Sequence, residues 1–328
     1  MSKVKPCYIE EVKQVSKRIL EAKGDFKFAV SADTHLDNSL PDTFRNIKAV
    51  DEEVGFDCLM HLGDFLNGNI PRKYTAQILK EQMDDFRNSI KTKAFYPAPG
   101  NHDGFYEAGH STDMTINEDW YEATKFTEEI ENVTRTKNRQ YFYADYPEKK
   151  IRLVILNSFH YSGFSNGERF EKIYGFDTEQ IEWVKNTALT VGSDWTIILS
   201  SHDMPFSGFD PNYKDEDNKI VNGNLMFDAV LEAKKNNGFS IAAWFIGHHH
   251  GDLIINVRGV NFILVASGTA YVPTLWDSPV PPEFGEFFPR RELNTYTEDL
   301  WDSVILDKSS RRLKLIRFGA GEDREASY

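Results

Sequence analysis

The sequence predicts an α/β protein in which two mixed β-sheets pack face to face, with helices on their outer sides. Short apolar runs rich in β-branched and aromatic residues recur along the chain and are typical of buried strands. These runs alternate first with segments of helical periodicity, whereas the later ones form hairpin-like pairs. No repeat or low-complexity tract divides the 328 residues, so one large domain is expected.

The predicted elements follow in chain order. A helix over residues 9–22 has apolar residues at helical spacing and is expected to pack against the core. Another helix is predicted from Asp177, an N-cap with Gln180 at the N3 position, through residue 187, and a further one covers 225–235. The predicted strands cover residues 26–32, 58–62, 94–98, 141–143, 151–157, 196–200 and 242–246, followed by hairpins of 253–257 with 261–266 and 303–307 with 313–317.

The domain organisation expected is an N-terminal helix in residues 1–24 that packs on a single domain of residues 25–328. Two insertions interrupt this domain. Residues 104–139 are polar, aromatic and acidic, with a helical pattern, and are expected to frame the pocket. Residues 271–301 contain five prolines among aromatic residues, which predicts irregular structure. This second segment is interpreted either as a pocket wall or as a loop that covers a sheet edge.

Five of the predicted strands are each followed by side chains that bind metals. Because ligands gather outside the carboxyl ends of strands in α/β sheets, these side chains are expected to share one site. Each alone has a plainer interpretation, as a turn residue, a helix cap or a core histidine, but seven together favour a metal centre. The candidate ligands are Asp33, His35, Asp64, Asn101, His202, His248 and His250.

The ligand chemistry predicts a centre of two divalent transition-metal ions. Imidazole and carboxylate together suit Mn, Fe, Zn or Ni, and seven ligands exceed what one four-coordinate ion uses. A carboxylate can bridge two ions about 3.5–4 Å apart, and Asp64 is the expected bridge. Gly63, Gly100 and Gly247 come just before ligands, where a sharp turn or a close backbone approach to the ions requires a residue without Cβ.

The motifs D-x-H, G-D, G-N-H-D, a later single histidine and G-H-x-H, in this order over residues 33–250, resemble those of the calcineurin-like metallophosphoesterase superfamily. The resemblance implies a four-layer αββα sandwich. It also implies that His102 contacts substrate or protonates the leaving oxygen, that Asp103 orients His102, and that His249 is the variable position of its motif. The implied ligands are Asp33, His35, Asp64 and His250 for one ion, and Asp64, Asn101, His202 and His248 for the other.

Two branches of the superfamily fit the sequence poorly. Purple acid phosphatases have glycine where this chain has His35, and a tyrosine ligand soon after the G-D motif, where residues 65–69 contain none. Calcineurin-type serine/threonine phosphatases carry G-D-x-V-D-R-G and G-N-H-E, whereas the third motif here ends in Asp103. The remaining group includes phosphodiesterases, cyclic nucleotide hydrolases, phosphomonoesterases and nucleases, which the motifs do not separate.

Composition and charge limit the classes of molecule that the chain is expected to bind. The net charge of -13 argues against a broad nucleic-acid or anionic-membrane surface and favours a small phosphate-ester substrate. Cys7 and Cys58 form no disulfide framework, and Cys58 lies in a predicted strand, so it is expected in the core. Neither a signal-like N-terminus nor a membrane-spanning stretch is present, which predicts a cytoplasmic protein. Oligomeric state is left open.

The expected reaction is metal-dependent hydrolysis of phosphate mono- or diesters, with a metal-bridging hydroxide as nucleophile and His102 as leaving-group acid or phosphate contact. Two alternatives remain open, a metal-dependent nuclease and a non-catalytic scaffold with the same fold. His61, His110 and His160 belong to no motif and are interpreted as structural. His61 nevertheless precedes the Gly63-Asp64 turn closely enough to support the ligands.

Overall fold

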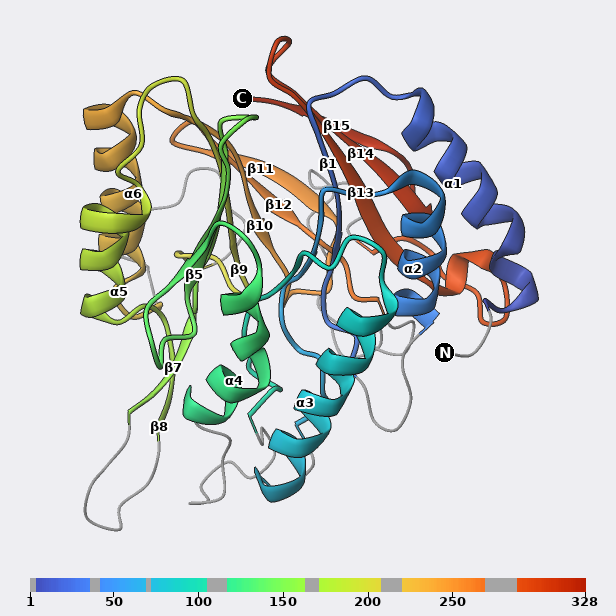
Figure 1. The fold of residues 1–328 in the computed structure, drawn as a ribbon, viewed down its shortest axis with the longest axis horizontal. Helices are drawn as coiled ribbons and strands as arrows, with labels where there is room; N and C mark the ends of the chain where they lie inside the picture. The colour runs from blue at the N-terminus through green and yellow to red at the C-terminus, as the bar shows by residue number, and fades with distance from the viewer. Residues whose placement is uncertain are drawn as a thin grey trace.

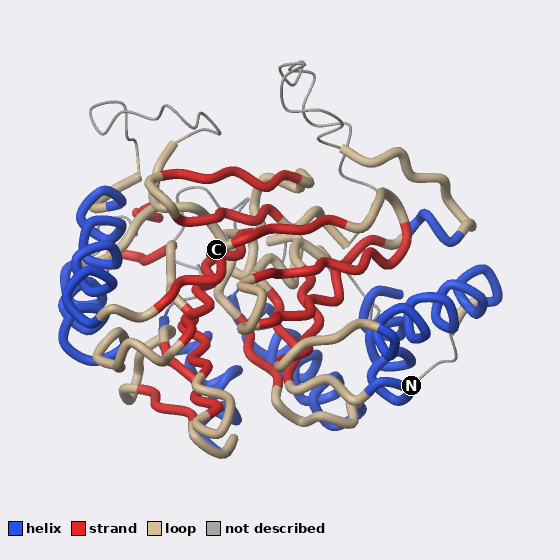
Figure 2. The backbone as a smooth tube through the Cα atoms, turned by 90° about the horizontal axis from the view of Figure 1, so that it is seen from above, coloured by secondary structure: helices blue, strands red, loops and turns tan. Residues whose placement is uncertain are grey.

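The computed structural model describes residues 4–35, 42–68, 72–104, 117–162, 171–207, 220–268 and 288–328. Within these ranges, two large β-sheets pack face to face, and helices cover the outer face of each sheet (Figure 1). The view from above shows the strands in the centre and the helices at either side (Figure 2). The predicted fold class is therefore confirmed.

The first sheet has six strands in the order β15-β14-β13-β1-β2-β3. Strands β1, β2 and β3 are parallel, whereas β13, β14 and β15 join antiparallel to β1 and to one another, so the sheet is mixed. The bounds are β1 Phe26–Ser31, β2 Cys58–His61, β3 Phe95–Pro97, β13 Leu300–Asp307, β14 Arg312–Gly319 and β15 Arg324–Ser327.

The second sheet has seven strands in the order β11-β12-β10-β9-β6-β5-β4. Its centre, from β12 to β6, is parallel, and both edges are antiparallel. A separate two-stranded sheet pairs β7 (Phe159–Ser162) with β8 (Glu171–Tyr174). The bounds of the main strands are β4 Val133–Arg135, β5 Phe142–Tyr146, β6 Ile151–Ile155, β9 Thr196–Ser201, β10 Ser240–Ile246, β11 Leu253–Val257 and β12 Val260–Leu264.

The helices divide between the two sheets. Apolar side chains of α1 (Ile9–Glu21), α2 (Asp42–Val54), α3 (Arg72–Ser89) and α4 (Asn117–Thr124) form one core with the first sheet. Those of α5 (Thr178–Trp183) and α6 (Gly223–Asn237) form another with the second sheet. Short 3₁₀ segments lie at Pro6–Tyr8, Lys125–Glu129 and Tyr296–Glu298, and a π-helical turn, Val184–Ala188, continues α5.

The four layers follow from side-chain alternation along strands that are apolar on both faces. In β1, Phe28 and Val30 point into the core between the sheets, whereas Ala29 packs with the helices. In β9, Ile198 enters the central core and its neighbour Leu199 the outer one. Two-sided burial explains why these strands read as continuous apolar runs in the sequence.

Most predicted elements are confirmed, with boundary shifts of a few residues. The side chain of Asp177 caps α5 by accepting the backbone N–H of Gln180 at 2.6 Å. Cys58 is fully buried in the core between the sheets. The sequence interpretation missed α2 and α3, although Phe44, Ile47 and Val50 form a buried stripe on α2.

The two predicted insertions are only partly described. Residues 105–116 and 269–287 lie outside the described residues, as does His110, so the pocket-framing predictions stay predictions. The prediction of irregular structure through residue 301 is wrong at its end, because Trp301 belongs to β13. Its indole is fully buried and stacks on Phe318 of β14, and this packing outweighs the proline-rich local composition.

Candidate metal centre

The strands that precede the candidate ligands end at one edge of the sandwich. Parallel register aligns Ser31 with His61 and His61 with Pro97, so the loops after β1, β2 and β3 lie side by side. Ile246 aligns in the same way with Ser201, which brings the loops after β9 and β10 together. The convergence predicted from the motifs is therefore observed.

Backbone hydrogen bonds tie these loops to one another. The N–H of Asp33 donates to Gly63 O at 3.0 Å, and that of His35 donates to Asp64 O at 3.0 Å. The Ser267 hydroxyl, which the motifs did not indicate, donates to Asp33 O at 2.6 Å. The ligand loops thus form one hydrogen-bonded unit across the two sheets.

Five candidate ligands have a left-handed backbone. A positive φ is uncommon in residues other than glycine and clusters at functional sites, where the surrounding structure maintains it. At this centre the candidate ligands themselves adopt the strained backbone conformation. The residues are Asp33 (φ 53°), His35 (44°), Asp64 (56°), His248 (62°) and His250 (53°).

The three glycines serve two different purposes. Gly63 has φ 98° and makes the sharp turn before Asp64. Gly100 and Gly247 lie so close to the carboxylates of Asp64 and Asp33 that a Cβ would clash there. A Cβ on Gly100 would lie 2.3 Å from Asp64 Oδ1, and one on Gly247 would lie 2.7 Å from Asp33 Oδ2.

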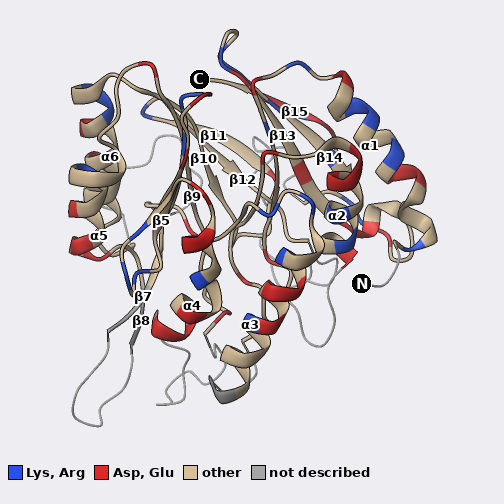
Figure 3. Cartoon of the chain, viewed as in Figure 1, with Lys and Arg blue, Asp and Glu red and all other residues tan. Residues whose placement is uncertain are grey.

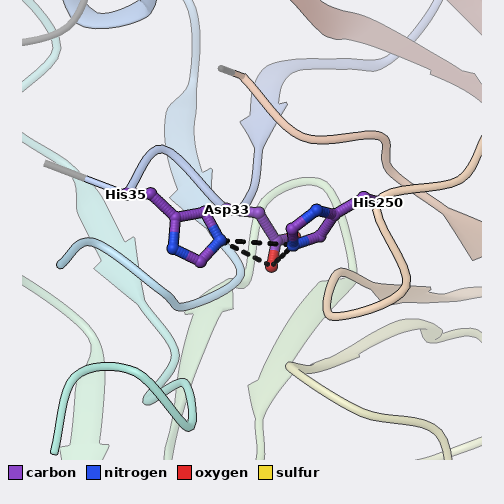
Figure 4. Close-up of side chains that lie close together, drawn as sticks. All are labelled: Asp33, His35 and His250. Atoms are coloured by element: carbon purple, nitrogen blue, oxygen red, sulfur yellow. Dashed lines mark hydrogen bonds and ion pairs between the residues drawn. The ribbon is translucent and has the colours of Figure 1, made fainter. Parts of the chain in front are cut away.

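One group of ligands surrounds Asp33. His250 Nε2 lies 3.2 Å from Asp33 Oδ1 and 3.2 Å from His35 Nε2, and His35 Nε2 lies 4.0 Å from the same carboxylate oxygen. Figure 4 shows both imidazoles directed toward the Asp33 carboxylate. Three ligand atoms thus converge at distances that suit one shared ion.

A second group surrounds Asp64. His202 Nε2 lies 3.1 Å from Asp64 Oδ2 and 3.0 Å from Asn101 Oδ1, and a ring nitrogen of His248 completes the cluster. His202 Nδ1 donates to Leu62 O at 2.6 Å, which fixes the tautomer and directs Nε2 at the carboxylate. Asp64 also lies beside His35, whose Nε2 is 4.0 Å from Asp64 Oδ2.

His102 lies at the edge of the Asp64 group, with Nε2 4.0 Å from Asp64 Oδ2 and its side chain one quarter exposed. The expectation that Asp103 orients this ring is wrong. His102 Nδ1 is bonded to Asn67 O at 2.7 Å. The buried Asp103 carboxylate instead accepts the backbone N–H groups of Asp64, Phe65, Leu66 and Gly100 and so clamps the Asp64 loop.

Two further side chains support the ligand loops. His61 is fully buried, accepts the Gly63 N–H at Nδ1 and is bonded to Thr34 Oγ1 through Nε2, which agrees with a supporting position. Asp203, directly after His202, accepts His249 Nε2 at 3.0 Å. The sequence interpretation missed Asp203, although an acidic residue beside a ligand at a strand end was a visible signal.

The pKa values reflect a competition between burial and charge. Burial lowers the pKa of His35 to about 4 and that of His248 to about 3, so both imidazoles are neutral at pH 7. Burial acts in the same direction on His202, but the carboxylates of Asp64 and Asp33 outweigh it and raise the pKa to about 9. The two buried carboxylates thus draw positive charge into the centre.

Comparison with protein families finds a match to the calcineurin-like phosphoesterase family over residues 26–252, more than half of the chain. The chain belongs to this family. No match was found among curated protein sequences. The family match spans every candidate ligand, from Asp33 to His250.

Solved structures include similar folds. A dimetal phosphatase from Danio rerio is similar at 15% identity and a TM-score of 0.56, over 93% of this chain and 100% of that chain. A Vps29 variant from Entamoeba histolytica has 9% identity and a TM-score of 0.37, with coverages of 92% and 99%. GAP50, described as the anchor in the inner membrane complex of Plasmodium, has 10% identity and a TM-score of 0.43, with coverages of 89% and 84%. At these identities the likeness concerns the fold alone.

The donor set of this chain fits two divalent ions. Asp33 and Asp64 are buried, and among the residues that the structure describes neither has a lysine or arginine ion-pair partner. Buried carboxylates are otherwise paired or coordinate metals. Their neighbours are the imidazoles of four histidines and the Asn101 amide, the donors that borderline divalent metals accept. Over the described part of the chain, the helices are too short or too polar to cross a membrane.

Proposed function

We propose that this chain is a dinuclear metal-dependent hydrolase of small phosphate esters. The observation that carries the proposal is the position of Asp64, whose carboxylate takes part both in the cluster with His202 and His248 and in the cluster with His35 and His102. A carboxylate between two groups of imidazoles is the geometry of a bridging ligand.

The proposed ligands divide as the clusters do. Asp33, His35 and His250 would hold one ion together with Asp64, and Asn101, His202 and His248 would hold the other with the same carboxylate. When bound, such a pair of ions supplies a water of lowered pKa and neutralises charge on the phosphoryl oxygens. The four imidazoles and the amide would bind as neutral ligands, so the centre would keep an excess of positive charge toward a phosphate.

His102 is the proposed partner of the leaving oxygen. Its Nδ1 faces Asn67 O at 2.7 Å, which fixes the ring and leaves Nε2 directed toward the Asp64 carboxylate. Nε2 is therefore the atom that would transfer a proton, or donate a hydrogen bond, to the oxygen that departs. The partial exposure of the ring leaves room for a substrate beside it.

A small substrate is favoured over a nucleic acid. The chain carries a net charge of -13, and the cartoon in Figure 3 shows acidic and basic residues interspersed along the outer helices. Strong binding to a nucleic-acid backbone depends on clustered Lys and Arg. Both phosphate monoesters and diesters remain candidate substrates.

The test is a hydrolysis screen of the full chain supplied with Mn²⁺, on phosphomonoesters, phosphodiesters, cyclic nucleotides and labelled single-stranded DNA. We expect turnover of at least one small ester that chelator abolishes and Mn²⁺ restores. The Asp228→Ala variant, which removes an exposed carboxylate on α6, serves as the control and should keep full activity. Cleavage of DNA alone would replace the proposal with a nuclease, and inactivity with two bound ions would replace it with a scaffold.

A further inference from the structure

Four charged side chains form a closed ring beside the metal centre. Arg317 donates through Nη2 to Asp252 Oδ1 at 2.8 Å and through Nε to Asp302 Oδ1 at 3.0 Å. Arg324 joins the same two carboxylates, with Nη1 2.5 Å from Asp252 Oδ1 and Nη2 2.6 Å from Asp302 Oδ2. Each acid thus contacts both arginines, and we call this set the charged ring.

The ring is buried and electrically balanced. The side chains of Asp302 and Arg317 are 0% and 2% exposed, and those of Asp252 and Arg324 are 8% and 15% exposed. Burial alone would lower the pKa of Arg317, but Asp302 and Asp252 outweigh it and raise the pKa. Because buried ion pairs carry a large desolvation cost, such a ring is weak evidence for stability and better evidence for fixed geometry.

The ring joins two parts of the chain that are distant in sequence, and it does so next to the proposed ligand His250. Asp252 follows His250 by two residues and directly precedes β11, whereas the other three members lie on β13, β14 and β15. His250 is one of the ligands with a left-handed backbone, at φ 53°. The strained turn that directs His250 toward Asp33 is therefore held at Asp252, which binds arginines of the C-terminal strands.

We propose that the charged ring is a positioning device for the metal centre, through which strands β13 to β15 fix the backbone after His250 and so the approach of its imidazole to Asp33 and His35. The inference rests on the proposed dinuclear function. It assigns a role to C-terminal strands that lie beyond the family match, which ends at residue 252. Its four members are positioning residues, and none is a ligand.

The inference predicts a selective effect. Loss of a ring carboxylate leaves a buried arginine charge unbalanced, which should shift the backbone at His250, two residues from Asp252, more than at His248, four residues from it. Asn101 and His202 lie on other loops and should stay in place. Residues that orient a metal ligand from outside the coordination sphere typically contribute 10–100-fold to metal affinity. A ring that only stabilised the whole domain would weaken both ions equally or neither.

The experiment measures Mn²⁺ binding to the full chain by calorimetry and by electron paramagnetic resonance, which distinguishes a coupled pair of ions from a single one. The variants are Asp252→Asn, close to His250, and Asp302→Asn, far from it in sequence. The matched control is Arg258→Met, which breaks the half-exposed Arg258–Asp228 ion pair at the turn between β11 and β12. Melting with excess chelator reports the stability of each metal-free variant.

We expect both ring variants to bind one ion roughly 10–100-fold more weakly, to retain the other, and to lose the coupled-pair signal at low Mn²⁺. They should resemble His250→Ala and differ from His202→Ala, and Arg258→Met should match the wild type. Two ions bound with unchanged affinity, or both weakened equally, would overturn the inference and leave the proposed function intact. A wild-type chain that binds no ion would overturn both.

Discussion

Two pairs of buried carboxylates lie close together in this molecule and are neutralised in different ways. Asp252 and Asp302 sit in a ring with two arginines, so their charge is balanced within the protein. Asp33 and Asp64 are at least as deeply buried, yet among the described residues their ionic partners are histidines alone. The first pair is balanced within the protein, whereas the second has the side chains that could hold cations.

The contrast separates a structural from a functional use of the same side chain. Transfer of a carboxylate out of water is costly unless a counter-charge or hydrogen bonds replace the lost hydration. Around Asp33 and Asp64 the chain adds strained ligand backbones and neutral imidazoles instead of a lysine or arginine. Without bound cations, the buried negative charge of this arrangement is balanced less well than that of the ring. This is the expected property of a metal centre.

A third buried carboxylate shows a further solution. Asp299 accepts hydrogen bonds from Thr43 Oγ1 at 2.5 Å, Asn46 Nδ2 at 2.8 Å and its neighbour Leu300 N at 2.9 Å. Burial raises its pKa to about 6, because these donors and the nearby charge of Arg291 offset only part of the lost hydration. Its protonation state should therefore change near pH 6.

The largest expected effect comes from Asp64→Ala, which removes the carboxylate shared by both groups. We expect loss of both ions and a fall in kcat/KM on the order of 10³-fold or more, at least the effect of removing one electrostatic stabiliser. Elemental analysis and turnover on the best substrate measure the two losses. Full occupancy of both sites in the folded variant would show that Asp64 is not the bridge.

The next effect concerns His102, which lies beside the Asp64 group but is not one of the proposed ligands. With an alkyl or ribose leaving oxygen, His102→Ala should lower kcat on the order of 10²–10⁴-fold, since the departing oxygen needs a proton. With a nitrophenyl ester the loss should be clearly smaller, whereas His248→Ala and His250→Ala should fail on both esters. Equal losses of His102→Ala on both, with metals retained, would point to phosphate positioning instead.

Metal binding should stabilise the chain by mass action, because the unfolded state lacks the site. Mn²⁺ at 100 times its dissociation constant should add about 2.7 kcal/mol per site to the free energy of unfolding. Urea titrations with Mn²⁺ and with chelator measure this gain, and Asp64→Ala should show little of it. Equal stability of the wild type with Mn²⁺ and with chelator would show that Asp33 and Asp64 do not bind cations in the folded state.

The smallest effect is the pH dependence from Asp299. A folded pKa of about 6, above the ordinary 3.8, favours the protonated form in the native state. Its stabilising contribution is therefore full below pH 3.8 and is lost as the pH rises through about 6, with a size of about 3 kcal/mol. Metal-free wild type should lose more stability than Asp299→Asn between pH 4 and pH 7 in urea titrations. Parallel curves would mean that Asp299 keeps an ordinary pKa.

The sequence by itself determined the fold class and the membership of the candidate site. Strand burial is encoded locally as apolar runs, and each run ends at a metal-binding side chain, so the convergence of Asp33, Asp64 and His202 follows from the sheet rule alone. The Asp177 cap was likewise predictable, because its partner is three residues away. The roles of these ligands stay predictions until metal binding is measured.

Only the tertiary structure decided which groups hold the site residues in place. Asn67 O, not Asp103, contacts His102, and Asp103 bonds to Phe65 N, 38 residues away. Arg317 and Asp252 are 65 residues apart in the chain. Such contacts depend on how loops from different strands pack. A carbonyl oxygen carries no side-chain signature, and a charged residue reads as solvated until the fold buries it beside its counter-charge.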